Sequence, residues 1–111
     1  MIDDHEAFRA SARLLLEADG FVVVAESATG VDGVRAADRY GPALVVLDVR
    51  LPDIDGFEVA GRLARLAAPP QVVLVSSRPA ATYGPRVAHA PVRGFLLKSE
   101  LSGAALRLLL A

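Results

Sequence analysis

Four short apolar runs constrain the fold of this chain more than any other feature. They are "FVVVAES" (21–27), "ALVVLD" (43–48), "QVVLVSS" (71–77) and "RGFLLK" (93–98). Their apolar residues follow one another without the polar alternation of a strand that has one face in water. Continuous runs rich in β-branched residues are typical of strands covered on both faces, so the sequence predicts a parallel sheet.

Helical patterns alternate with these runs. Apolar residues recur at helical spacing at Phe8, Ala12, Leu15 and Leu16, at Val59, Leu63 and Leu66, and at Leu101, Ala105, Leu108 and Leu109. Thr29, three residues before Asp32, can cap a further helix over 30–40. The stretch 78–91 holds three prolines and one glycine, which predicts at most a short helix there. The alternation indicates an α/β fold.

Composition bounds the class of protein. A chain of 111 residues, 53% hydrophobic and with a net charge of −1, fits one globular domain. Its 12 basic and 13 acidic residues are scattered, which argues against nucleic-acid binding. It has no cysteine, which excludes disulfides and thiolate chemistry. No apolar run approaches the ~20 residues that a membrane-spanning helix needs, and we expect a cytoplasmic protein.

Polar groups stand where the strands are expected to end. They are Asp48, Ser76 with Ser77, Lys98, and the pair Asp3–Asp4 just before the first helix. Parallel strands bring their carboxyl ends to one edge of the sheet, which is where ligands bind in such folds. Three carboxylates gathered there would repel one another unless a cation joined them. A hard divalent ion with oxygen ligands, most naturally Mg²⁺, answers that need.

Lys98 is the only lysine among the 12 basic residues, the others being arginine. Lysine is a compact charge on a flexible stem, which can pair with a carboxylate or a phosphate without the flat fork of a guanidinium group. Its position at the end of the last run favours a place in the same site.

Taken together, these motifs resemble the CheY-like receiver domains of two-component response regulators. The resemblance rests on "DDH" (3–5), "LDVRLPDIDG" (47–56), "SS" (76–77) and "GFLLK" (94–98), which occur in the family's order. It implies a flavodoxin-like, doubly wound parallel sheet of (βα)5 type with strand order 2-1-3-4-5. It also implies a stand-alone receiver over residues 1–111, because the 13 residues after Lys98 leave no room for an output domain.

The resemblance assigns roles to individual residues. The phosphoacceptor would be Asp48, and Mg²⁺ would be held by Asp3, Asp4, Asp48 and the backbone carbonyl of Arg50. Ser76 would be the switch hydroxyl, Lys98 the phosphate-binding cation and Phe95 the aromatic residue that changes rotamer. The implied partners are a histidine kinase or phosphotransfer protein and a downstream protein. The resemblance also implies that the protein is not an enzyme and that its only catalytic activity is slow autodephosphorylation at most.

Two other functions remain open from the residues alone. One is a receiver-like module that binds partners without being phosphorylated. The other is a Mg²⁺-dependent phosphohydrolase with an aspartyl-phosphate intermediate, but that motif needs a second Asp two residues after the nucleophile, where this chain has Arg50.

The remaining polar residues have structural explanations. We expect Asp53 and Asp55 to shape their loop and cap the next helix. His5 and His89 have no partners at metal-ligand spacing, which predicts a loop residue beside the acidic pair and a surface residue. Gly30 and Gly33 do not form a dinucleotide-binding loop, and no positioned histidine makes a hydrolase triad with Ser76 or Ser77.

The amino-terminal end departs from the family. Only Met1 and Ile2 precede the acidic pair, where receivers have their first strand, so that strand is expected to be truncated. In the order 2-1-3-4-5 this strand is central, and its neighbours would keep partly unpaired hydrogen-bonding edges. Either the true start lies upstream or the chain is marginally stable.

Overall fold

The fold is an open α/β sandwich around a parallel sheet. A computed structural model describes all residues, 1–111. Its strands, in the spatial order β1-β2-β3, are β1 (Leu44–Asp48), β2 (Gln71–Ser76) and β3 (Gly94–Leu97). The α-helices are α1 (Glu6–Ala18), α2 (Gly30–Tyr40), α3 (Gly56–Ala64), α4 (Arg86–His89) and α5 (Gly103–Leu110), with short 3₁₀ turns η1 (Ala80–Tyr83) and η2 (Lys98–Glu100). No helix is both long and apolar enough to cross a membrane.

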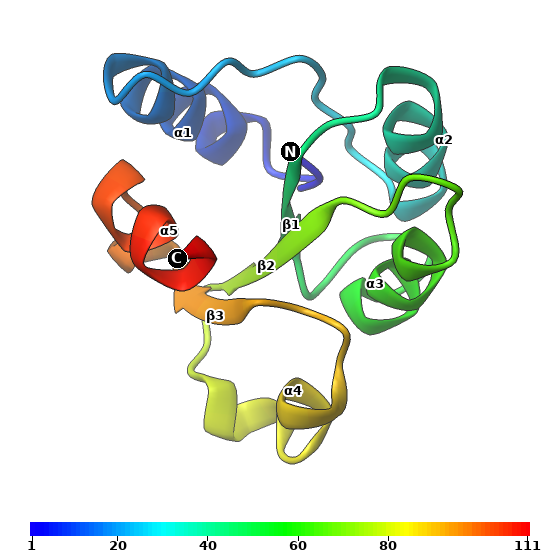
Figure 1. The fold of residues 1–111 in the computed structure, drawn as a ribbon. Helices are drawn as coiled ribbons and strands as arrows, with labels where there is room; N and C mark the ends of the chain where they lie inside the picture. The colour runs from blue at the N-terminus through cyan, green and yellow to red at the C-terminus, as the bar shows by residue number, and fades with distance from the viewer.

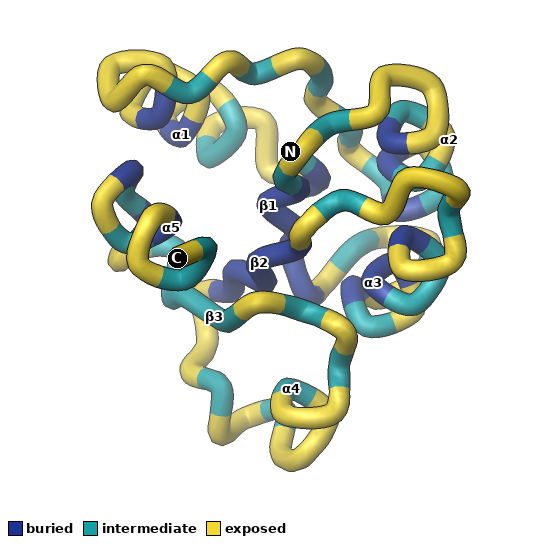
Figure 2. The backbone as a smooth tube through the Cα atoms, viewed as in Figure 1, coloured by how far each residue is buried: buried dark blue, intermediate teal, exposed yellow.

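Helices cover the sheet on both sides, with α1 and α5 on one face and α2 and α3 on the other (Figure 1). β1 and β2 are correspondingly the most buried part of the chain, whereas β3 is of intermediate burial (Figure 2). Neighbouring residues of β1 enter different cores, because Val45 and Leu47 pack with α3 while Val46 packs with α1 and α5. This two-sided burial explains why the strand sequences are continuously apolar.

The periodicity predicts the buried residues of α1 and α5 only in part. In α5 the buried side chain is Leu106, whereas Leu108 is exposed. The reason is that Leu101 lies before the helix, which begins at Gly103 after the capping Ser102, so the expected period started too early. In α1, Leu15 is exposed and Ala12 and Leu16 are buried. The helix expected over 30–40 and the short helices within 78–91 are confirmed.

The segment 21–27 is not the strand that its composition predicts. It forms no strand, and it pairs with the amino-terminal residues only at Ala25, which accepts from the Met1 amino group, and at Ser27, which bridges to Ile2. Ile2 also bridges to Leu47, so Met1–Asp3 provides the only backbone between this segment and β1. Val22, in the stretch with no partner, is 83% exposed. The bridges agree with the predicted strand order where it is visible, and the truncated first strand is the physical reason for the lost ladder.

An apolar hollow of about 370 Å³ lies beside the unpaired segment. It is lined mainly by hydrophobic residues, among them Met1, Leu16, Phe21, Leu44 and Leu106. Burial lowers the pKa of the Met1 amino group, which donates to the carbonyl oxygen of Ala25 at 3.1 Å. Because side chains do not fill this hollow, the amino-terminal end of the sheet is incompletely packed.

The loop after β1 is fixed by its own aspartates, as expected. Asp53 accepts hydrogen bonds from the amide groups of Gly30 and Val31 at 2.8 and 2.9 Å, and so ties the loop to the start of α2. Asp55 caps α3. Gly56 then passes so close to the backbone carbonyl of Asp48 that a Cβ atom there would collide with it.

We expect an amino-terminal extension of five β-branched residues to stabilise the protein. Roughly six new hydrogen bonds and three buried side chains, set against the ordering of five residues, leave a gain of about 2–4 kcal/mol. Urea unfolding would measure it, with a Gly/Ser extension of equal length as the control. Equal midpoints for the two extensions would show that the hollow does not accept a strand.

We also expect the Asp53→Asn variant to be less stable than the parent at neutral pH. Hydrogen bonds from the backbone amide of Val31 and, to a smaller extent, of Gly30 lower the pKa of Asp53 to about 2. A lowered pKa means that the folded protein gains stability from the charged form, and that the gain is lost as pH falls. The stability difference between the two proteins should therefore shrink between about pH 5 and pH 2. A difference independent of pH would contradict this.

Candidate functional site

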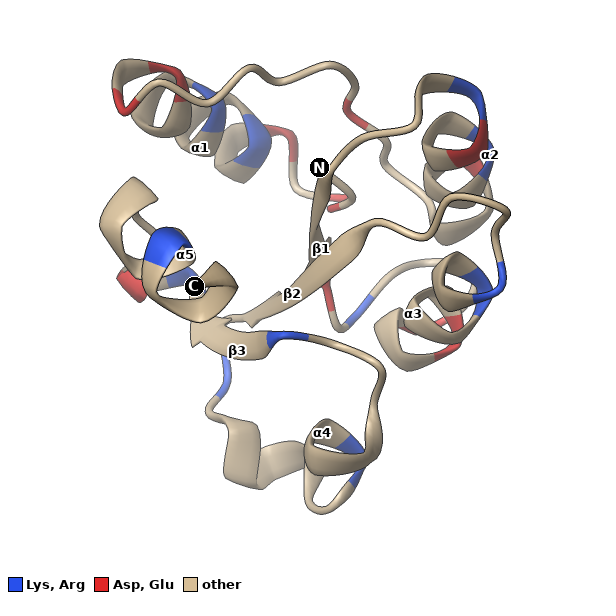
Figure 3. Cartoon of the chain, viewed as in Figure 1, with Lys and Arg blue, Asp and Glu red and all other residues tan.

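The polar residues at the strand ends meet at one edge of the sheet, as predicted. Asp48 ends β1, Ser76 ends β2 and Lys98 directly follows β3, while Asp3 and Asp4 follow the bridging residue Ile2. Asp48 is the only charged residue within the three strands, and the other charges lie on helices and loops (Figure 3). The group borders an open hollow of about 390 Å³, whose lining includes Asp4, Asp48, Ser76 and Lys98.

Two of the carboxylates are buried together with one cation. The side chains of Asp3 and Asp48 are 1% and 4% exposed. Lys98 Nζ lies 2.7 Å from Asp3 Oδ2 and 3.4 Å from Asp48 Oδ2. Asp3 Oδ2 accepts no well-aligned hydrogen bond, so the charge of Lys98 is its only compensation among the side chains. Burial without full hydrogen bonding is costly, and it leaves this oxygen able to accept a cation.

The environment of Asp48 shifts its pKa upward overall. Burial raises the pKa of Asp48, and the neighbouring Asp3 raises it further. Lys98 and the backbone amide of Arg50, which lies 3.3 Å from Asp48 Oδ1, act in the opposite direction. Additional positive charge in the hollow would strengthen that opposing effect and favour the carboxylate.

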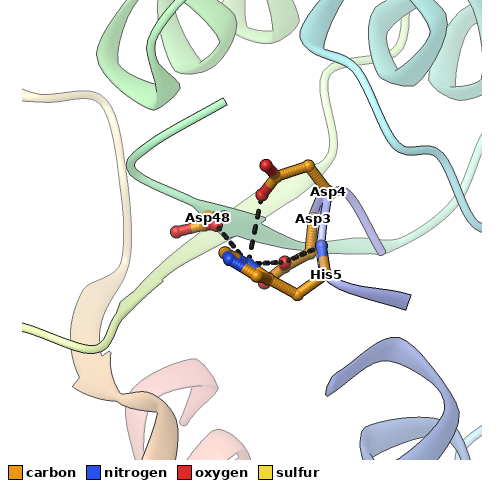
Figure 4. A group of neighbouring side chains, drawn as sticks. All are labelled: Asp3, Asp4, His5 and Asp48. Atoms are coloured by element: carbon orange, nitrogen blue, oxygen red, sulfur yellow. Dashed lines mark hydrogen bonds and ion pairs between the residues drawn. The ribbon is translucent and has the colours of Figure 1, made fainter. Parts of the chain in front are cut away.

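His5 is more closely involved than its sequence position indicated. It lies in the loop beside the acidic pair, as expected, but it does have partners. Its Nδ1 is 3.0 Å from Asp3 Oδ1, 3.1 Å from Asp4 Oδ1 and 3.8 Å from Asp48 Oδ2 (Figure 4). The contacts with Asp3 and Asp4 are local, whereas the approach to Asp48 comes from the tertiary structure, because Asp48 is far away in the sequence. His89 is exposed at the end of α4, as predicted.

Ser76 is already hydrogen-bonded, to a residue that the sequence did not single out. Its Oγ lies 2.6 Å from the hydroxyl oxygen of Tyr83, and either group can donate. Ser76 Oγ also accepts from the amide of Arg78 at 3.0 Å. Tyr83 could have been found only by knowing that the turn η1 folds back over the end of β2.

Tyr83 belongs to a small aromatic cluster. Its ring lies between those of Phe57 and Phe95, with centroid distances of 6.0 and 6.2 Å. Phe95, the predicted aromatic residue, is half-buried in β3 and contacts the core on the α3 side. Arg86 of α4 stacks on Phe57 and forms an ion pair with Asp55 at 2.6 Å. The strand ends are thereby connected to the exposed surface around α4.

The remaining predicted residue, Arg50, borders the hollow with an exposed side chain. Its backbone lies next to Asp48, as its amide contact shows. A backbone carbonyl can act as a metal ligand whatever the side chain is.

Comparisons with known proteins agree with this geometry. The family model described as response regulator receiver domain matches residues 1–108. The chain is 38% identical over 100 residues to BvgA of Bordetella pertussis, named for transcription regulation of virulence factors, and 30% identical over 100 residues to the DNA-binding transcriptional activator EvgA of Escherichia coli. Each match covers 90% of this chain but 48% and 49% of those relatives, so the chain spans about half their length.

A solved structure gives the same result for the fold. The signal receiver domain of NarL from Mycobacterium tuberculosis superposes with a TM-score of 0.84 at 28% identity, over 99% of this chain and 93% of that domain. Fold, strand-end residues and sequence relatives therefore lead to one conclusion: the chain belongs to the response regulator receiver family of two-component systems.

Proposed function

We propose that this receiver accepts a phosphoryl group on Asp48 in a Mg²⁺-dependent reaction and signals by binding other proteins. The observation that carries the proposal is the placement of Asp48 beside Asp3 and Lys98 at the edge of an open hollow. A nucleophile, an acidic group and a cation meet there with room for a phosphoryl group.

The residues present fit a hard divalent ion. Asp3, Asp4 and Asp48 offer carboxylate oxygens, and the backbone carbonyl of Arg50 can complete the set. Asp3 Oδ2, buried without a hydrogen bond, is the oxygen with most to gain from a cation. Bound Mg²⁺ would supply positive charge against the phosphoryl oxygens.

The chemical step is a transfer between two nucleophiles. A carboxylate oxygen of Asp48 forms a bond to phosphorus, and the bond from phosphorus to the donor breaks, leaving the electron pair on the donor atom. For a phosphohistidine donor that atom is an imidazole nitrogen, and for acetyl phosphate it is an acetate oxygen. The transition state is loose, so position and charge matter most. Lys98 supplies charge from the protein side.

The product creates the signal by adding charge and acceptor oxygens at Asp48. Where Ser76 is the donor to Tyr83, its hydroxyl must turn away from Tyr83 before it can donate to these oxygens. Loss of that hydrogen bond frees Tyr83 within the cluster with Phe57 and Phe95. Two populations of the surface around α4 would then differ in their affinity for a partner.

The partners follow from this chemistry. A histidine kinase or phosphotransfer protein would supply the phosphoryl group, and a downstream protein or domain would recognise the changed surface. BvgA and EvgA, which this chain matches over about half of their length, are named as transcription regulators, and this supports an output in transcription control. We propose residues 1–111 as the receiver unit. The downstream protein or domain would recognise the exposed surface around α4. The receiver itself would not contact nucleic acid or membrane directly.

The second candidate is a receiver-like module that binds partners without phosphorylation. It is favoured by one observation, the existing Ser76–Tyr83 hydrogen bond, which could hold a fixed binding surface. Phosphorylation remains the better proposal because a purely binding module has no need of buried carboxylates around Lys98.

The first experiment is labelling with acetyl phosphate, followed by intact-mass measurement. We expect one phosphoryl group per chain with Mg²⁺ and almost none with a chelator. Asp48→Asn should abolish labelling, while the matched variant Asp53→Asn should retain it. A folded parent protein that is never labelled would support the binding-only module, and labelling of Asp48→Asn would move the acceptor elsewhere.

The second experiment tests the role of Tyr83. Removing its hydroxyl in Tyr83→Phe leaves Ser76 free to turn, which should tighten binding of the phosphate mimic beryllofluoride about fivefold for a competing hydrogen bond of ~1 kcal/mol. Tyr40→Phe, at an exposed tyrosine of α2, is the control. Titration followed by ¹⁹F NMR gives the affinities. Indistinguishable affinities in the two variants would remove Tyr83 from the switch.

A further inference from the structure

His5 is the one member of the acidic group that offers nitrogen rather than oxygen. Its Nδ1 and the carboxylate oxygens of Asp3, Asp4 and Asp48 all lie within 4.8 Å of one another. The imidazole ring points into the group, between the carboxylates, as Figure 4 shows. The side chain is 63% exposed, so Nδ1 lies beside the carboxylates although the imidazole ring is not buried.

Two of the distances from His5 Nδ1 match the spacing within a coordination shell. An octahedral ion with bonds of about 2.1 Å has adjacent ligands about 3.0 Å apart and opposite ligands about 4.2 Å apart. His5 Nδ1 is 3.0 Å from Asp3 Oδ1 and 3.1 Å from Asp4 Oδ1. Its distance from Asp48 Oδ2, 3.8 Å, falls between the two values. His5 Nδ1 therefore occupies a ligand position relative to the acidic pair.

A second observation is a buried carboxylate oxygen whose charge is compensated by Lys98 alone. Asp3 Oδ2 is buried and accepts no hydrogen bond. Lys98 Nζ, its counter-charge at 2.7 Å, is also 3.3 Å from His5 Nδ1. When Nδ1 carries a lone pair, Lys98 can donate to it, and a lone pair is what a metal ion requires.

We propose that His5 is a metal ligand through Nδ1, and that it raises the affinity of this site for first-row transition ions such as Co²⁺ and Zn²⁺ relative to Mg²⁺. This inference rests on the proposed metal site. Imidazole suits Co²⁺, Ni²⁺ and Zn²⁺, whereas Mg²⁺ takes oxygen ligands and gains little from nitrogen. His5 is thus a specificity-determining residue for the ion.

Calorimetric titration of the intact chain with Mg²⁺ and with Co²⁺ tests the proposal. In His5→Asn the Kd for Co²⁺ should rise about tenfold or more, while the Kd for Mg²⁺ changes less than about threefold. His89→Asn, the same change at the only other histidine, should leave both constants as they are. His5→Gln serves as a second variant if His5→Asn folds poorly.

A spectroscopic readout reports ligation directly. With Co²⁺ bound, the parent should show paramagnetically shifted imidazole proton resonances, including an exchangeable one from Nε2–H, and His5→Asn should lack them. Equal losses of affinity for both ions, or tighter binding of both after removal of His5, would overturn the proposal. Absence of Mg²⁺ binding in the parent protein would instead overturn the proposed function. Mg²⁺ binding with no histidine resonances would leave that function intact and exclude His5 as a ligand.

Discussion

The contact of Lys98 with Asp3 and Asp48 is the interaction on which the functional edge of this domain depends. Two carboxylates, 1% and 4% exposed, share an ammonium group that is itself 12% exposed. Removing one partner of such a buried group typically costs several kcal/mol, because the other charge is left without compensation. The structure tolerates the arrangement because Lys98 comes from the end of β3 and reaches across β2 to the end of β1.

The same edge is connected to the surface by a short chain of contacts. Ser76 contacts Tyr83, whose ring lies between Phe57 and Phe95, and Arg86 stacks on Phe57 from the exposed side. Each contact is local and modest in energy. Together they connect the strand end at Ser76 to a surface that contains no residue of the acidic group.

Much of this could be predicted from the sequence, for physical reasons that differ between elements. Continuous apolar runs leave a clear signal, so β1, β2 and the half-buried β3 were identified. The ends of strands in a parallel sheet had to bring Asp48, Ser76 and Lys98 together. The segment 21–27 was misassigned because a strand also needs a neighbour, and composition does not report whether the neighbour is present.

The parts of the site that escaped prediction depend on tertiary contacts. His5 directly follows Asp3 and Asp4 in the sequence, but it approaches Asp48 only because β1 ends next to the amino-terminal loop. Tyr83 gains its partner only because the turn η1 folds over Ser76. Neither contact has a counterpart in local spacing. The misplaced register in α5 has a local cause, since the helix begins two residues later than its apolar period suggested.

A double-mutant cycle on Asp48→Asn and Lys98→Met, measured by urea unfolding in a metal chelator, tests the central claim most directly. If Lys98 compensates the buried carboxylates, its loss should be severe when Asp48 is charged and clearly milder when Asp48 is replaced by Asn. The predicted coupling energy is about 1–3 kcal/mol. Additive effects, within about 0.5 kcal/mol, would contradict the claim that Lys98 holds this edge together.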